Sequence, residues 1–109
     1  MKAVVYEEYA PDDNYSKILK VKQVDDPKPK PNEIVFKVKA AALNYNDLWG
    51  MRGQPVAVPL PHISGSDASG EVIAVGEEVA NIKVGDRVVS HSNMSCRVCK
   101  ACTDGREYD

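Results

Sequence analysis

The sequence predicts a mainly β domain built as a partly open β-barrel with one or two short helices. Short segments that alternate apolar and polar residues recur along the 109 residues, and they are separated by seven glycines and seven prolines. Many short strands with this punctuation are typical of barrels, where closure of the sheet hides strand edges that would otherwise pair with other chains. A hydrophobic content of 43% is enough for one compact domain with a core of its own.

The first half of the chain contains three predicted strands. In residues 3–6 and 18–24, apolar and polar side chains follow the two-residue period of a β-strand. We expect these two strands to pair as a hairpin through the turn-rich segment 11–14. Three prolines within 27–31 forbid a helix and remove amide donors, so this segment is expected to cross the surface in an extended form. Residues 33–43 form the clearest strand, because apolar side chains recur there at every second position.

A short helix is predicted immediately after that strand. Asn44 is a favoured N-cap, the helix is expected over 45–51, and Gly53 is suited to end it. Prolines then make 54–62 a loop. The last two predicted strands, divided by a glycine-bounded turn, are residues 68–75 and 86–90.

Cys96, Cys99 and Cys102 have the spacing of a metal-binding loop. Structural zinc takes four soft ligands in a tetrahedron, and short spacings let one loop wrap the ion with little loss of chain entropy. Three unrelated thiols are the alternative, but free cysteines are usually buried among apolar residues, whereas these alternate with charged ones. We expect the fourth ligand just beyond Asp109, so that the chain stops within the zinc loop and holds zinc partially or not at all. His91 is a less favoured fourth ligand.

Composition excludes several classes of partner. The formal net charge is −2 with both signs interspersed, so there is no basic stripe for a nucleic acid. The chain has no apolar run of about 18 residues and no signal peptide pattern, which argues against a membrane partner. Cysteines grouped at ligand spacing agree with a reducing compartment, and we expect a cytoplasmic protein.

Several ordered motifs together resemble a known family. Segments 65–76 and 84–88, the cysteine loop, and the run from Asn44 to Asp47 are similar to the N-terminal GroES-like domain of medium-chain dehydrogenases/reductases, over essentially the whole chain. The resemblance implies that residues 1–109 are the substrate-side domain of an oxidoreductase. It also implies a separate Rossmann domain, because no Gly-x-Gly-x-x-Gly turn follows a strand here. The resemblance further implies that NAD(P)H is not bound by these residues alone, that they are inactive alone, and that the complete enzyme forms homo-oligomers.

The departures from the family bear on mechanism. The zinc-dependent alcohol dehydrogenases of this superfamily carry Cys where Asn44 stands, and His and Glu where Ser66 and Asp67 stand. An amide and a hydroxyl do not replace a thiolate and an imidazole at zinc, so we expect no catalytic zinc. Asp47, which would orient the ligand histidine in the zinc enzymes, is left with a capping or hydrogen-bonding role.

Without a metal, hydride addition to an activated C=C bond is the reaction that the resemblance favours, as in quinone oxidoreductases and crotonyl-CoA reductases. The small-molecule substrate would then develop enolate charge, which hydrogen-bond donors can stabilise. The predicted catalytic donors are Asn44 and Tyr45, and the predicted cleft residues are Asn46, Asp47, Ser66 and Asp67.

Plainer interpretations remain open. Asn44 alone is explained as an N-cap, Tyr45 as a half-buried ring, and Ser66 with Asp67 as polar turn residues. Two other functions also remain, namely a zinc-dependent alcohol dehydrogenase with degenerate ligands and a stand-alone GroES-like binding module.

Overall fold

The first two strands form a small antiparallel sheet. The computed structural model describes residues 1–55 and 57–107, and in it β1 (Lys2–Val5) pairs with β2 (Lys20–Gln23) so that Val4 lies opposite Val21. The connection between them contains a 3-10 turn at Tyr15–Lys17. The predicted hairpin is therefore confirmed, with its strands slightly shorter than the alternation suggested.

A second antiparallel sheet contains the three remaining strands in the order β3 (Ile34–Ala42), β4 (Asp67–Val75) and β5 (Arg87–Val89). The register of β3 and β4 shifts between Val38 and Ala40. There the Lys37 carbonyl comes so close to Gly70 that a β-carbon at position 70 would overlap it. Position 70 of β4 therefore requires glycine, because the backbone of β3 comes too close for a side chain. A glycine inside a strand is a common sign of such an approach.

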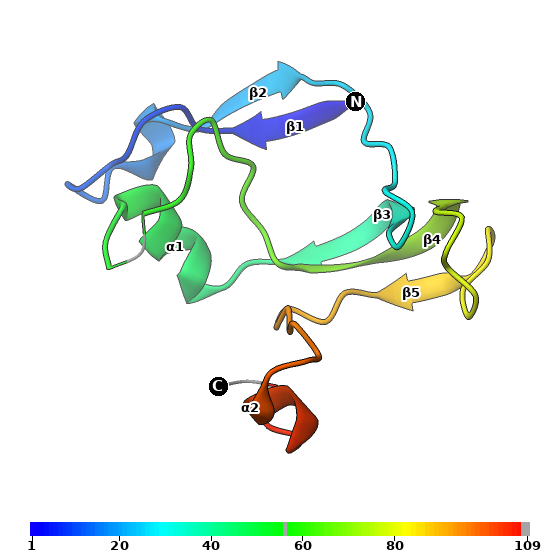
Figure 1. Ribbon diagram of the computed structural model, residues 1–109. Helices are drawn as coiled ribbons and strands as arrows, with labels where there is room; N and C mark the ends of the chain where they lie inside the picture. Colours follow the sequence, from blue (N-terminus) through cyan, green and yellow to red (C-terminus); the bar gives the residue numbers. More distant parts are fainter. Residues whose placement is uncertain (56, 108–109) are drawn as a thin grey trace.

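The two sheets stay open among residues 1–55 and 57–107, since no strand pairing joins β1 or β2 to β3, β4 or β5 (Figure 1). The mainly β, GroES-like fold class is confirmed, but the sheets are not closed into a barrel. The expected protection of strand edges by closure is absent from this part of the molecule.

A compact core joins helix α1 (Tyr45–Arg52) to the first sheet. Its members are apolar side chains from the segment after β1, the 3-10 turn and the helix, packed against a proline-rich loop. The buried members are Tyr6, Ala10, Ile18 and Met51, with Tyr15, Leu48 and Val58 partly buried against them. This packing fixes the second half of α1 against the segment after β1.

Two backbone contacts complete the frame of the site. Tyr6 and His62 exchange backbone hydrogen bonds of 3.0 and 2.9 Å, which hold the loop before β4 against the end of β1. Gly53 ends α1 as predicted, at a φ of 77° that suits glycine. A further short helix, α2 (Lys100–Thr103), follows Cys99 and lies apart from both sheets in Figure 1.

Candidate functional site

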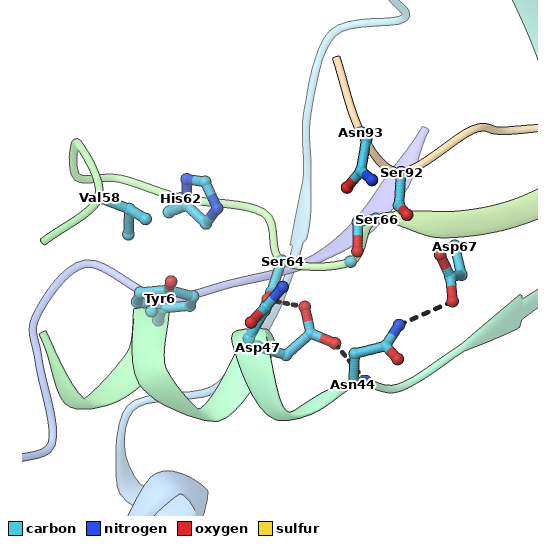
Figure 2. Close-up of a pocket in the computed structure, with 13 residues that line it drawn as sticks. Tyr6, Asn44, Asp47, Val58, His62, Ser64, Ser66, Asp67, Ser92 and Asn93 are labelled. Carbon is cyan, nitrogen blue, oxygen red and sulfur yellow. Dashed lines mark hydrogen bonds between the residues drawn. The ribbon is translucent and has the colours of Figure 1, made fainter. Parts of the chain in front are cut away.

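The start of α1 is built around the carboxylate of Asp47. Its Oδ2 accepts a hydrogen bond of 2.8 Å from the backbone N–H of Asn44, and its Oδ1 accepts one of 2.7 Å from the Ser64 hydroxyl (Figure 2). The residue is only 6% exposed. Because a buried carboxylate needs such partners, both bonds stabilise the junction of α1 with the loop before β4. Asp47 thus has the hydrogen-bonding role that the sequence predicts.

The side chain of Asn44 faces β4. Its Nδ2 donates a hydrogen bond of 2.8 Å to Oδ2 of Asp67, the first residue of β4 (Figure 2). Since a carboxylate oxygen only accepts, this contact fixes the amide with Nδ2 toward Asp67 and Oδ1 away from it. Two residues that are 23 positions apart in the chain therefore form one polar pair across the site.

The turn before β4 is anchored to the segment after β5. The Ser90 hydroxyl donates a hydrogen bond of 2.8 Å to the carbonyl of Ser66 and accepts one of 2.9 Å from the amide of Ala68. This double contact holds Ser66 and Asp67 in place with their side chains directed toward α1 (Figure 2).

These groups line a pocket of about 280 Å³, near the lower limit for small-ligand sites. The predicted residues Asn44, Asn46, Asp47, Ser66 and Asp67 all line it, together with Tyr6, Gly50, Val58, His62, Ser64, Gly65, Ser92 and Asn93. Tyr45 does not. Its side chain is 71% exposed, and its ring lies edge-on to Trp49 at 6.1 Å between centroids.

The pocket residues that the sequence did not indicate come mainly from loops and from the core. Ser64 carries no motif that marks it as a partner of Asp47, and Tyr6 follows an alternating strand and so resembles an ordinary core aromatic. His62 ends a proline-rich loop, and this position gave no sign that it would pair with Tyr6. Tyr6 and His62 are held at the pocket by long-range backbone pairing, and Ser64 by its side-chain bond to Asp47.

The pocket has an unusual balance of polar groups. Two carboxylates line it, those of Asp47 and Asp67, and no lysine or arginine is among the lining residues that the structure describes. Burial raises the pKa of Tyr6 above its ordinary value, and the nearby Tyr9 and Asp47 add to the effect. The Tyr6 hydroxyl therefore stays protonated at neutral pH.

The three cysteines gather as the spacing predicts. The Cys99 thiol lies 3.4 Å from the Cys102 sulfur, Cys96 lies 3.8 Å from Cys102, and all three sulfurs lie within 4.8 Å of one another. Tetrahedral zinc with Zn–S bonds of about 2.3 Å places its sulfurs about 3.8 Å apart. The donor set therefore fits three of the four ligands of a structural zinc.

Local hydrogen bonds prepare one of these thiols for a metal. Backbone amides of Val98 and Cys99 lower the pKa of the Cys96 thiol to about 7, whereas the contact with Cys99 raises the pKa of Cys102. His91 turns its Nδ1 toward the backbone of Asn93 at 3.1 Å instead, and within the described part of the chain it does not join the cysteine cluster.

Fold and site together define a GroES-like β domain whose pocket is lined by amide, hydroxyl and carboxylate groups. Comparison with known proteins gives the family. The chain belongs to the alcohol dehydrogenase GroES-like domain family, whose model matches residues 30–109.

Individual relatives agree with this assignment. The chain is 36% identical over 107 residues to the acryloyl-coenzyme A reductase of Metallosphaera sedula, and 40% identical over 93 residues to the crotonyl-CoA carboxylase/reductase of Cereibacter sphaeroides. The matches cover 98% and 80% of this chain, but only 30% and 21% of those proteins. The structure of an NAD-dependent alcohol dehydrogenase superposes with a TM-score of 0.88 at 38% identity, over 99% of this chain and 31% of that one.

The chain thus spans less than a third of the length of these relatives. Within residues 1–55 and 57–107, the structure contains no helix with the length and apolar character needed to cross a membrane.

Proposed function

We propose that this chain is the substrate-side domain of an NAD(P)H-dependent oxidoreductase that reduces a C=C bond conjugated to a carbonyl, without a catalytic zinc. The observation that carries the proposal is the hydrogen bond between Asn44 and Asp67, two residues that, by the family resemblance, stand where the zinc-dependent enzymes carry Cys and Glu. The names of two relatives, an acryloyl-coenzyme A reductase and a crotonyl-CoA carboxylase/reductase, support the same substrate class.

The donor set at this end of the pocket is poor for a metal ion. Asn44 offers a neutral amide and Ser66 a hydroxyl, and Asp67 is the one ionisable side chain of the three. Within the described residues, the cysteine cluster is the one group of three or more His, Cys, Asp or Glu side chains whose ligand atoms converge. Zinc chemistry at Asn44 therefore lacks its usual ligands.

The amide of Asn44 is suited to hold developing negative charge. Its Nδ2 carries two hydrogens, of which one is donated to Asp67, and the other has no acceptor among the described residues. When bound, NAD(P)H supplies the hydride. As the β-carbon of the substrate is reduced, its carbonyl oxygen gains negative charge, and the second N–H of Asn44 stabilises that oxygen by a hydrogen bond. The α-carbon then takes a proton from solvent.

Tyr45 has a different place in this proposal. Its hydroxyl lies on the exposed surface of α1 outside the pocket, so a ligand would reach it only from outside. Asn46, Asp47, Ser66 and Asp67 line the cleft, and of these Asp67 orients the amide instead of reacting. Asn44 is then the one predicted donor placed inside the pocket.

The remaining parts of the enzyme follow from the family and are equally proposals. A Rossmann domain outside residues 1–109 would bind NAD(P)H and close the cleft over the small-molecule substrate, and the complete enzyme would form homo-oligomers. Cys96, Cys99 and Cys102 would hold a structural zinc with a fourth ligand. Thiolate ligands require a reducing compartment, which favours the cytoplasm.

The test uses the complete protein. We expect NAD(P)H oxidation with enoyl thioesters, with no oxidation of primary alcohols, and one zinc per chain by elemental analysis. Asn44→Ala should lower kcat with a smaller effect on KM, whereas Asn81→Ala, which removes an exposed amide outside the pocket, should match the wild type.

A zinc-dependent alcohol dehydrogenase is the second candidate, and the 38% identity to an NAD-dependent alcohol dehydrogenase favours it. It predicts two zinc ions per chain and chelator-sensitive alcohol oxidation. That result, with Asn44→Ala releasing one ion, would overturn the proposal.

A further inference from the structure

One polar group at the pocket has no partner in the protein. Tyr6 is 0% exposed, and among the described residues its hydroxyl is the one buried side-chain polar atom that makes no hydrogen bond. Tyrosine hydroxyls in protein interiors usually find an acceptor, and native proteins tolerate an unpaired one mainly where function requires it. Tyr9 shows the ordinary situation nearby, since its hydroxyl donates to the carbonyl of Val58 at 2.6 Å.

The hydroxyl lies against α1 at a position where the helix carries no side chain. A β-carbon at Gly50 would lie 3.0 Å from the Tyr6 oxygen, so glycine at this position avoids crowding the hydroxyl. Val58 lies beside the same position, 3.7 Å from where the Gly50 β-carbon would be, and the His62 ring packs at a tilt against Tyr6 at 5.5 Å between centroids (Figure 2). We name this region, formed by Tyr6, Gly50, Val58 and His62, the inner end of the pocket.

The inner end is separate from the proposed reaction site. In Figure 2 the Asn44 and Asp67 pair lies at one end of the pocket and Tyr6 with His62 at the other, with Asp47 and Ser64 between them. One ligand that spans the pocket would therefore meet two groups of polar side chains. A carbonyl held at Asn44 leaves the Tyr6 end for a second polar atom of the same molecule.

The charges of the pocket restrict which kind of ligand atom can bind at the Tyr6 end. Burial keeps Tyr6 protonated, so its hydroxyl serves as a donor and calls for an acceptor. At the Tyr6 end the nearby carboxylate is that of Asp47, and no cationic side chain among the described lining residues offsets it, so a full carboxylate placed there would be repelled. An uncharged oxygen, a hydroxyl or a carbonyl, meets both conditions.

We propose that the inner end of the pocket determines specificity, and that the Tyr6 hydroxyl donates a hydrogen bond to an uncharged oxygen at the far end of a short unsaturated acyl chain. The assignment rests on the proposed function, because the reacting carbonyl must lie at Asn44. Tyr6 selects the substrate and takes no part in hydride transfer.

The experiment compares enoyl thioesters with and without that oxygen in the complete protein. The probes are four thioesters. Crotonyl thioester has no terminal oxygen, the 4-hydroxycrotonyl and 5-hydroxy-2-pentenoyl thioesters end in a hydroxyl, and glutaconyl thioester ends in a carboxylate. A site built to bind a hydroxyl discriminates strongly, so one of the hydroxylated substrates should exceed crotonyl thioester in kcat/KM by roughly tenfold or more. The glutaconyl thioester should be the poorest substrate.

Two variants isolate the hydroxyl. Tyr6→Phe keeps the ring packing, and it should abolish the preference while the apo protein melts at the same or a higher temperature, since an unpaired buried hydroxyl is removed. Tyr9→Phe loses a hydroxyl that is paired, and it should lower the melting temperature with the preference intact. Gly50→Ala crowds the Tyr6 oxygen and should weaken the preference as Tyr6→Phe does.

The outcomes separate this inference from the proposed function. Reduction of crotonyl thioester with no preference for either hydroxylated relative, or a preference that persists in Tyr6→Phe, would overturn the inference and leave the function standing. If no thioester is reduced, the proposed function fails. The inference is then decided by the binding of hydroxyacetone, a neutral probe. Hydroxyacetone must raise the melting temperature of the wild type but not that of Tyr6→Phe. Equal shifts in the two proteins would overturn the inference.

Discussion

The carboxylate of Asp47 gives the most direct test of the structure. Asp47→Ala removes two hydrogen bonds to a charged group, from the Asn44 amide at 2.8 Å and the Ser64 hydroxyl at 2.7 Å. Bonds of this type contribute about 1.5 to 3 kcal/mol each, so the variant should lose about 3 to 6 kcal/mol of unfolding free energy. That is a large fraction of the stability of a typical domain.

Asp47→Asn is the matched control. An asparagine oxygen can still accept the Asn44 N–H while its NH₂ donates to Ser64, whose hydroxyl rotates to accept, so only the charge is lost. We expect a loss of about 1 to 2 kcal/mol. Ser64→Ala should fall between the two variants, because it leaves one buried carboxylate oxygen without its partner.

The assay is urea unfolding of the complete protein, followed by the fluorescence of Trp49, which lies on α1. A double-mutant cycle between Asp47→Ala and Ser64→Ala should give a coupling energy of about 1 kcal/mol or more. Equal losses for Asp47→Ala and Asp47→Asn, or a loss below about 1 kcal/mol for the alanine variant, would refute the reasoning.

Three further predictions concern other parts of the molecule. Gly53→Ala should destabilise the protein by about 1 kcal/mol or more in thermal unfolding, because φ is 77° there and the new β-carbon would lie 2.8 Å from the Tyr9 ring. Gly105→Ala is the control: φ is 78° there but no atom lies near the new β-carbon, so this variant measures the backbone part of the cost alone. Arg52 lowers the pKa of Asp13 by a hydrogen bond, so the stability due to this pair should be complete above the ordinary pKa of 3.8 and lost as pH falls through the lowered value. Asp13→Asn should make stability depend less on pH in this acid range, and an unchanged pH dependence would contradict the prediction. Cys99→Ser should reduce zinc content measured by elemental analysis and leave enoyl reduction measurable, whereas loss of zinc from Asn44→Ala would point to a metal at the pocket.

The strands and α1 were predictable because their signals are local. Alternation, the proline-rich crossing and the glycine after α1 each act within a few residues, and the structure has the strands within a few residues of the expected positions. Closure of the barrel was not predictable in this way. It depends on pairing between distant strands, and the two sheets of the structure do not pair with each other.

The candidate site was predictable only where a motif marks it. The motifs around Asn44 and Asp67 indicated both residues, and the structure shows that they contact each other at 2.8 Å. Tyr45, next in sequence, carries the same kind of motif signal but projects to the surface, because successive helical residues face different directions. Tyr6 and Ser64 reach the pocket through tertiary contacts that leave no local pattern.

The way α1 begins has an evolutionary consequence. At the helix start, the carboxylate of Asp47 bonds to the backbone N–H of residue 44, and this bond does not involve the side chain that residue 44 carries. A lineage can therefore exchange an amide for a thiol there without rebuilding the scaffold. Metal-dependent and metal-free chemistries then become neighbouring solutions, separated by a few substitutions on one unchanged frame.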